Sequence, residues 1–263
     1  MQSVSNVFVE SFNALKNNPK LFLPKFLIAF LNSVIMLLFA STSLQVFQAM
    51  QLPLEQRQEL MIALMPALLL GLVLSIASFV LDILINALYS VAVQELHEKK
   101  KFSLQEAFNF SLKKFFVVFP AAFAFLILFS LLSLPFSFAI SSFLQSNNFE
   151  LAFVVLLLFM IFVFFANALF FMLYPVAVFE KKNFWQVLHR SVELFFKNSK
   201  EISVVSLLPF FLSLASWILA FFAENSSFLI LFIVGRFLLA VFGTYAYLTN
   251  PVFYFEFDSG SKA

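Results

Sequence analysis

Six long apolar segments alternate with short polar connections along this chain of 263 residues. In a helix, about 20 apolar residues cross the roughly 30 Å of hydrocarbon in a bilayer, and each segment is long enough. The second segment exceeds one crossing, and its polar start together with Pro66 places the expected beginning of that crossing near Ala67. The pattern predicts membrane-spanning helices over residues 22–46, 60–93, 115–140, 151–178, 202–222 and 228–248.

Short polar turns at residues 48–58, 145–150 and 224–227 join these segments into three helical hairpins. Before each hairpin lies a shorter segment whose apolar residues recur at helical spacing and are followed by lysines. We predict that each is an amphipathic helix in the membrane interface, with its lysines toward anionic headgroups. The alternative, connectors packed under the bundle, is compatible with this. The apolar residues are Val4, Phe8, Phe12, Leu15, Leu104, Phe108, Phe115, Trp185, Leu188, Val192 and Phe195, and the headgroup candidates are Lys16, Lys20, Lys113, Lys114, Lys197 and Lys200.

Two of these amphipathic segments begin with the sequence of a helix cap. Ser103 stands three residues before Glu106, which is the form of a capping box. Asn183 and Gln186 have the same spacing in a looser version. Helices are therefore expected to start at both places.

A short motif recurs at the end of each hairpin, at residues 89–95, 174–180 and 250–256. Each copy begins with tyrosine or asparagine and closes on a glutamate, and the three glutamates are separated by 85 and 76 residues. The recurrence indicates one unit used three times within a single membrane domain, residues 1–263. The units run over about residues 1–96, 102–181 and 183–257.

The composition supports a chain that faces lipid. Hydrophobic residues make up 62% of it and charged residues 11%, against about 45–50% and 25% in soluble proteins. That is too little charge to cover the surface of a soluble domain. The predicted class is an all-α polytopic membrane protein. Cysteine is absent, which excludes disulfides and thiolate metal sites.

The basic residues predict the orientation in the cell membrane. All but two of the 16 lysines and arginines fall on the same side of the predicted spans. The exceptions are Arg57, in a turn on the other side, and Arg236, inside a span. Because basic loops stay in the cytoplasm, both termini are expected there, and six spans satisfy that parity. The residues assigned to the cytoplasmic side include Lys16, Lys20, Lys25, Lys113, Lys114, Lys197 and Lys200.

Four polar residues lie inside predicted spans, namely Asp82, Asn86, Asn167 and Arg236. An ionisable group there is a functional candidate, because inserting it costs about 2.5–3.5 kcal/mol. Asp82 lies 13 residues before its motif glutamate and Arg236 lies 20 before its own. Their depths then differ by about 10 Å, which argues against a direct ion pair.

Asp82 and Asn167 share one register position in their repeats, and Gly243 occupies it in the third. This suggests one inward-facing position used three ways. The alternative is a hydrogen-bonded packing contact between helices. Serines on single faces of two spans are also interpreted as packing residues; they are Ser130, Ser133, Ser137, Ser141, Ser206, Ser213 and Ser216.

Several function classes find no support in the sequence. His97 lacks the second histidine that a zinc-binding helix requires, and His189 belongs to no recognisable triad. A glycine-rich phosphate loop is absent, and the net charge is only +2. We therefore expect a non-enzymatic protein with no cofactor, no nucleotide and no nucleic-acid partner.

Residues 173–197 resemble a junction found in a broad group of uncharacterised prokaryotic six-span membrane proteins. That group includes the membrane domain attached to some glycerophosphodiester phosphodiesterases. The resemblance rests on Pro175, Glu180, Ser191 and Lys197, and residues 13–24 are similar to the opening helix of the same group. It implies six spans with cytoplasmic termini. The soluble catalytic barrel of those enzymes has no counterpart in this sequence, so the resemblance implies no activity.

Two functional hypotheses follow. The first is a membrane module that organises lipid or a protein partner through its basic cytoplasmic helices; its partners would be membrane lipids, another protein or a second copy of the chain. The alternative is a small-solute or ion transporter with Asp82, Asn86, Asn167 and Arg236 around a central cavity. Three parallel repeats argue for a pseudo-threefold arrangement, whereas transporters commonly use inverted pairs. The centre of such an arrangement could be filled by lipid.

Overall fold

The computed structural model describes residues 2–50, 53–98, 102–223 and 229–257. Within these ranges the chain is helical and forms no strand. The expected turn at 224–227 and the lysines at 99–101 lie outside the described residues. The helices are α1 (Gln2–Asn17), η1 (Pro19–Leu21), α2 (Phe22–Met50), α3 (Leu54–His97), α4 (Leu104–Gln145), α5 (Phe149–Leu169), α6 (Leu173–Phe179), α7 (Phe184–Lys197), α8 (Ser199–Ala223) and α9 (Leu229–Phe257).

Six segments in the described ranges are long and apolar enough to cross a membrane, which confirms the predicted all-helical, multi-pass architecture. They match the six predicted spans in order, although most extend further than the apolar runs alone. The segments are Pro19–Thr42, Glu55–His97, Leu104–Gln145, Phe149–Phe179, Ser199–Ser216 and Leu229–Phe257.

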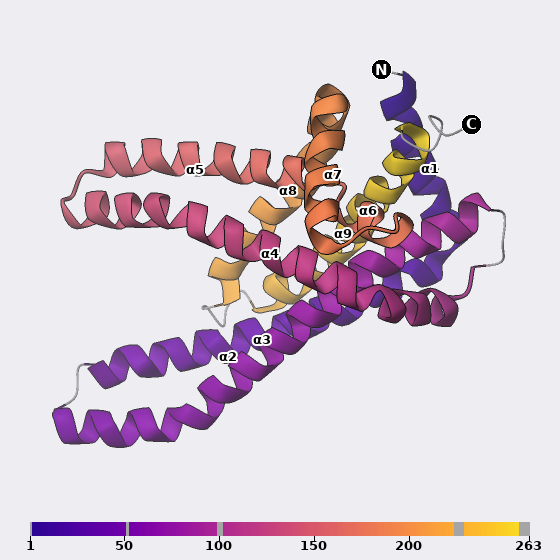
Figure 1. Ribbon diagram of the computed structural model, residues 1–263. Helices are drawn as coiled ribbons and strands as arrows, with labels where there is room; N and C mark the ends of the chain where they lie inside the picture. Colours follow the sequence, from indigo (N-terminus) through magenta and orange to yellow (C-terminus); the bar gives the residue numbers. More distant parts are fainter. Residues whose placement is uncertain (1, 51–52, 99–101, 224–228, 258–263) are drawn as a thin grey trace.

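Consecutive long helices pack side by side in three arms, α2 with α3, α4 with α5, and α8 with α9. Figure 1 shows the α2–α3 and α4–α5 arms diverging toward the left, while α1 and the C-terminal part of α9 lie together at the opposite, compact end. Large apolar side chains stand exposed on the arms, including Phe116, Phe138 and Ile230. Helices satisfy their own backbone groups, so such faces suit lipid.

The hydrophobic core lies at the compact end, and the motif-bearing ends of α3, α6 and α9 meet there. The ring of His97 stacks on Phe255 with centroids 4.8 Å apart, and Phe179 lies 4.9 Å from the same ring. Tyr89 is fully buried and donates a hydrogen bond to the Leu21 carbonyl at 3.1 Å. The helix ends that carry Glu95, Glu180 and Glu256 therefore share one side of the molecule.

Helices α1 and α7 each bury one face against this core. In α1 the buried residues include Val7, Ser11 and Leu15, and the Phe8 carbonyl accepts a hydrogen bond from Tyr245 in α9 at 3.0 Å. In α7 the buried residues are Val187, Ser191, Leu194 and Phe195. Phe12 and Trp185, predicted on the apolar faces, are 59% and 66% exposed, so part of each apolar face remains uncovered.

The caps at the two predicted helix starts differ in completeness. Asn183 and Gln186 form a full capping box, since each side chain accepts from the backbone N–H of the other residue. Ser103 accepts from the Glu106 N–H at 3.4 Å, and its own N–H donates to Glu95 at 3.4 Å. The first motif glutamate thus contacts the cap of the next helix.

The amphipathic segment before the third span is not a separate helix. It continues into the span as α4, which runs unbroken from Leu104 to Gln145 with Pro120 and Pro135 inside it. A proline removes one hydrogen bond of the ladder and need not end a helix when neighbouring turns hold it. The fourth span is the one that breaks, between α5 and α6.

Candidate functional site

Lys25, in the first turns of α2, is buried and ion-paired inside the protein. Its ammonium lies 2.7 Å from Asp82 Oδ1 and donates to Asn86 Oδ1 at 3.0 Å. Asn86 stands one turn after Asp82 on α3 and donates to Asp82 Oδ2 at 3.1 Å. The three side chains form a closed polar network that joins α2 to α3. Because Lys25 is only 6% exposed, the carboxylate supplies the counter-charge that a buried ammonium needs.

The same ammonium lies 3.7 Å from the centroid of the Tyr247 ring in α9. This is a cation–π contact, so Lys25 links three long helices at one point. The pattern of basic residues assigned Lys25 to the cytoplasmic side but did not indicate that its side chain is buried and paired. The partner lies on another helix 57 residues away, a contact that spacing within one helix cannot indicate.

Arg236 does not contact Asp82 and binds Ser216 instead. Its Nη1 donates to Ser216 Oγ at 2.7 Å, between α9 and α8. The residue is 8% exposed, and its Nε is buried without a hydrogen-bond partner. Among the described residues no carboxylate pairs with it. The predicted offset in depth between Asp82 and Arg236 agrees with their separate partners.

A cavity of about 240 Å³ lies between α2, α3, α8 and α9. Lys25, Asp82 and Tyr247 line it together with Arg236 and Ser216. Gly243 also borders it, and a Cβ added there would meet nothing within 4 Å.

A second cavity, of about 180 Å³, adjoins the first and reaches the break between α5 and α6. Asp82, Pro209, Ser213 and Tyr247 line both. The second is otherwise polar on several sides, with Asn86, Asn167, Tyr174, Ser206 and Asn250. The two cavities thus bring together all four polar residues predicted from the sequence. Asn167 donates to its own helix at Val163, 2.8 Å away, and does not join the Lys25 network.

Backbone carbonyls at the break in the fourth span accept hydrogen bonds from other helices. Pro175 has no N–H, so the Phe171 carbonyl loses its helical donor. The Asn250 amide from α9 donates to that carbonyl at 3.0 Å. Ser191 of α7 donates to the Leu169 carbonyl at 3.2 Å. Side chains from two other helices therefore satisfy the freed backbone of the wall of the second cavity.

Several lining residues were missed or assigned another role. Ser206, Ser213 and Ser216 were interpreted as packing residues, and they line the cavities. Tyr174 and Asn250 begin the second and third copies of the glutamate motif, and that recurrence was the one signal that could have singled them out. Tyr247 lies three residues before Asn250, one helical turn away, and carried no signal.

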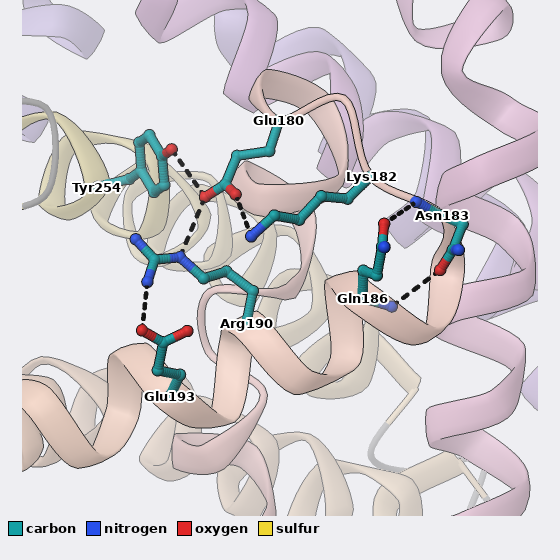
Figure 2. A network of polar contacts seen from close by, with 7 residues as sticks. All are labelled: Glu180, Lys182, Asn183, Gln186, Arg190, Glu193 and Tyr254. Carbon is teal, nitrogen blue, oxygen red and sulfur yellow. Dashed lines mark hydrogen bonds and ion pairs between the residues drawn. The ribbon is translucent and has the colours of Figure 1, made fainter. Parts of the chain in front are cut away.

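The second motif glutamate organises the connection between α6 and α7, as Figure 2 shows. Glu180 accepts from Lys182 at 2.7 Å, from Tyr254 at 3.1 Å and from Arg190 at 3.4 Å. Burial by itself raises the pKa of Glu180, but the contacts with Lys182, Tyr254 and Arg190 outweigh it and hold the pKa below its ordinary value. Arg190 also pairs with Glu193 at 2.7 Å.

The predicted headgroup lysines are mostly on the surface. Lys16, Lys20, Lys113, Lys197 and Lys200 are exposed, and Lys114 is half-buried. The Lys114 ammonium lies 6.0 Å from the centroid of the Phe110 ring, at the limit of a cation–π contact.

The described ranges contain no group of three histidine, cysteine or acidic side chains that could hold a metal ion. No family model, curated protein or solved structure matches this chain. The resemblance to six-span prokaryotic membrane proteins therefore stays a prediction.

Proposed function

We propose that the protein is a non-enzymatic lipid-organising module that binds the polar headgroup of a membrane lipid between its three arms. The observation that carries this proposal is the pair of polar cavities meeting at Asp82, Ser213 and Tyr247, where the arms leave the compact end. Cavities lined by amides, hydroxyls and charges among apolar helices suit a ligand with a polar head and an apolar tail.

The lengths of the arms support this assignment. Eighteen residues separate Asn167 from the start of α5 at Phe149, and eighteen separate Tyr247 from the start of α9 at Leu229. At 1.5 Å per residue, each helix extends about 27 Å beyond the polar residues. That is close to the roughly 30 Å of hydrocarbon in a bilayer. If the arms cross the bilayer, the cavities lie near one of its faces, at headgroup depth.

Register supports the threefold use of one hairpin unit. Asp82, Asn167 and Gly243, which share one position relative to the motif glutamates, all border the two cavities. The centre of the proposed pseudo-threefold arrangement is therefore the ligand site. The three units contribute in turn the carboxylate of Asp82, the amide of Asn167 and the open space beside Gly243.

The exposed residues of α1 and α7 favour an interfacial position for these helices. Phe12, Trp185 and Phe196 are more than half exposed, and Lys16 and Lys197 are exposed nearby in sequence. Aromatic and basic side chains together suit the boundary between headgroups and acyl chains. With the basic loops inside the cell, both termini would be cytoplasmic in the cell membrane.

A second candidate is transport of a small solute or ion, with the site around Asp82, Asn86, Asn167 and Arg236. The observation favouring it is that the Asp82 side chain is 34% exposed and borders both cavities. Such a carboxylate could exchange an ion or proton between the two spaces.

Native mass spectrometry of protein released from nanodiscs of defined lipid composition tests the lipid site. Gly243→Phe should lower the retained lipid several-fold, because the new ring would project into the first cavity. Ile230→Phe is the matched control, since this residue lies on the same helix and is 80% exposed. Equal lipid retention by the two variants would contradict the proposal.

Two further variants separate the alternatives. Loss of ion-coupled flux in proteoliposomes on Asp82→Asn, with lipid retention unchanged, would favour transport. Charge reversal at Lys113, Lys114, Lys197 and Lys200 tests the basic helices. If it released the lipid while Gly243→Phe did not, the lipid would be held by those helices and not by the cavities.

A further inference from the structure

Arg236 is the cationic group of the first cavity that has no counter-ion among the described residues. We propose that it gives this cavity a preference for lipids with an anionic headgroup, by binding phosphate oxygens. This inference rests on the proposed lipid site and names the class of lipid.

The charges around the cavity support an anionic ligand. Lys25 and Arg236 are cationic and Asp82 is anionic, which leaves one positive charge in excess. Asp82 lies 2.7 Å from Lys25 and neutralises it, so the excess belongs to Arg236. A charge in an apolar setting is strongly attracted to an opposite charge that enters the same space.

The hydrogen bonds of Arg236 are also incomplete. A guanidinium has five N–H donors, and its Nε is buried without a partner while Nη1 binds the neutral Ser216 hydroxyl. At 8% exposure the side chain has little access to solvent that could satisfy the rest. Phosphate oxygens accept from arginine in a paired geometry, which would supply the missing partners.

The position of Arg236 fits the order of groups in a phospholipid. Arg236 lies seven residues before Gly243, about 10 Å further toward the tips of the arms. Acyl chains would extend toward the tips, so the phosphate would lie at Arg236 and the terminal headgroup would point toward Asp82. The Asp82 carboxylate can accept hydrogen bonds from terminal hydroxyl groups, as in a glycerol headgroup.

The test compares the retention of phosphatidylglycerol with that of phosphatidylcholine, in nanodiscs that contain equal amounts of both. Both lipids carry the phosphate, but only phosphatidylglycerol has the net negative charge that balances the excess positive charge of the cavity. The wild-type protein should therefore retain it in roughly tenfold preference, which corresponds to about 1.4 kcal/mol. Arg236→Gln should abolish the preference, and Arg236→Lys, which keeps the charge without the planar fork, should leave part of it. Arg57→Gln, the same change at the tip side of the α2–α3 arm, should retain it in full.

The outcomes separate this inference from the function on which it rests. If the wild type showed no preference for phosphatidylglycerol, or if Arg236→Gln kept the preference of the wild type, the inference would be overturned while the lipid site stood. If the wild type retained neither phosphatidylglycerol nor phosphatidylcholine, the proposed function itself would fail.

Glycerol 3-phosphate is added as a soluble competitor. If it displaced the lipid, the site would be assigned to a free anion, and the inference that its ligand is a lipid would be overturned. Arg236→Lys keeps the test open if Arg236→Gln fails to fold, as judged by size-exclusion chromatography.

Discussion

At the residue scale, the central feature is the closed network of Lys25, Asp82 and Asn86, with Tyr247 over the ammonium. Each polar group has a partner from another side chain, and the network ties α2, α3 and α9 at one level. Removing one member leaves a charge in an apolar setting, whereas removing both charges does not.

Lys25→Met should therefore lower the free energy of unfolding in detergent micelles by about 1–3 kcal/mol, less than for a fully buried pair because Asp82 is one-third exposed. Adding Asp82→Asn to that variant should recover part of the loss. The measurement is the denaturant midpoint of the two single variants and the double variant. Additive losses would show that the two side chains do not interact.

Glu180 stabilises the α6–α7 connection through an ionised carboxylate held by Lys182, Arg190 and Tyr254. Its pKa is lower in the folded protein than its ordinary value of 4.5. The stabilisation is therefore present above that ordinary value and is lost as the pH falls through the lower folded value.

Glu180→Gln should lower the free energy of unfolding at pH 7 by about 1–2 kcal/mol. The variant should also lose less stability than the wild type as the pH falls below 4.5. Glu193→Gln is the control, because this side chain is 53% exposed and the change should cost less than about 1 kcal/mol. Thermal unfolding followed by circular dichroism over a pH series measures both. A Glu180→Gln variant with the acid sensitivity of the wild type would contradict the assignment.

At the scale of elements, the break between α5 and α6 depends on donors from outside the fourth span. Pro175 leaves the Phe171 carbonyl free, and Asn250 from α9 occupies it. Because this hydrogen bond joins α9 to the break, it holds the wall of the second cavity against α9.

Asn250→Ala should lower the free energy of unfolding by about 1–3 kcal/mol, because it leaves a backbone carbonyl without a donor. Pro175→Ala in the same chain restores an N–H four residues after Phe171 and should recover part of the loss. Unfolding of the two single variants and the double variant gives the coupling. No recovery would mean that the carbonyl finds another donor.

Features of the helices that depend on neighbours in sequence could be predicted, and features that depend on packing could not. Apolar runs predicted the six spans and their order, and the Asn183–Gln186 cap was predicted from its spacing, since both depend on neighbours in sequence. The continuity of α4 through Pro120 was not predicted, because a proline signals a missing hydrogen bond and not whether neighbouring turns hold the helix.

The candidate site was predicted in its residues and not in its contacts. Asp82, Asn86, Asn167 and Arg236 stood out because polar groups are rare in apolar spans. Lys25 did not, because it lies near the start of a span, where a lysine ordinarily extends toward the headgroups. Its pairing with Asp82 joins two helices, and one sequence alone does not give such a contact.

At the scale of the whole molecule, three apolar arms leave a compact end whose core includes residues of α1 and α7 (Figure 1). The polar cavities lie at the root of the arms, so a lipid between the arms would meet polar groups with its head and apolar helices with its chains. The central claim is this placement of the headgroup at Asp82, Ser213 and Tyr247.

Photo-crosslinking with lipids that carry a diazirine in either the headgroup or the acyl chain tests that claim most directly. After digestion, mass spectrometry locates the labelled residues. The headgroup probe should label residues 206–216 of α8 and 243–250 of α9, and the acyl probe should label residues nearer the tips of the arms. Headgroup labelling confined to α1 and α7, with none at the cavities, would contradict the account.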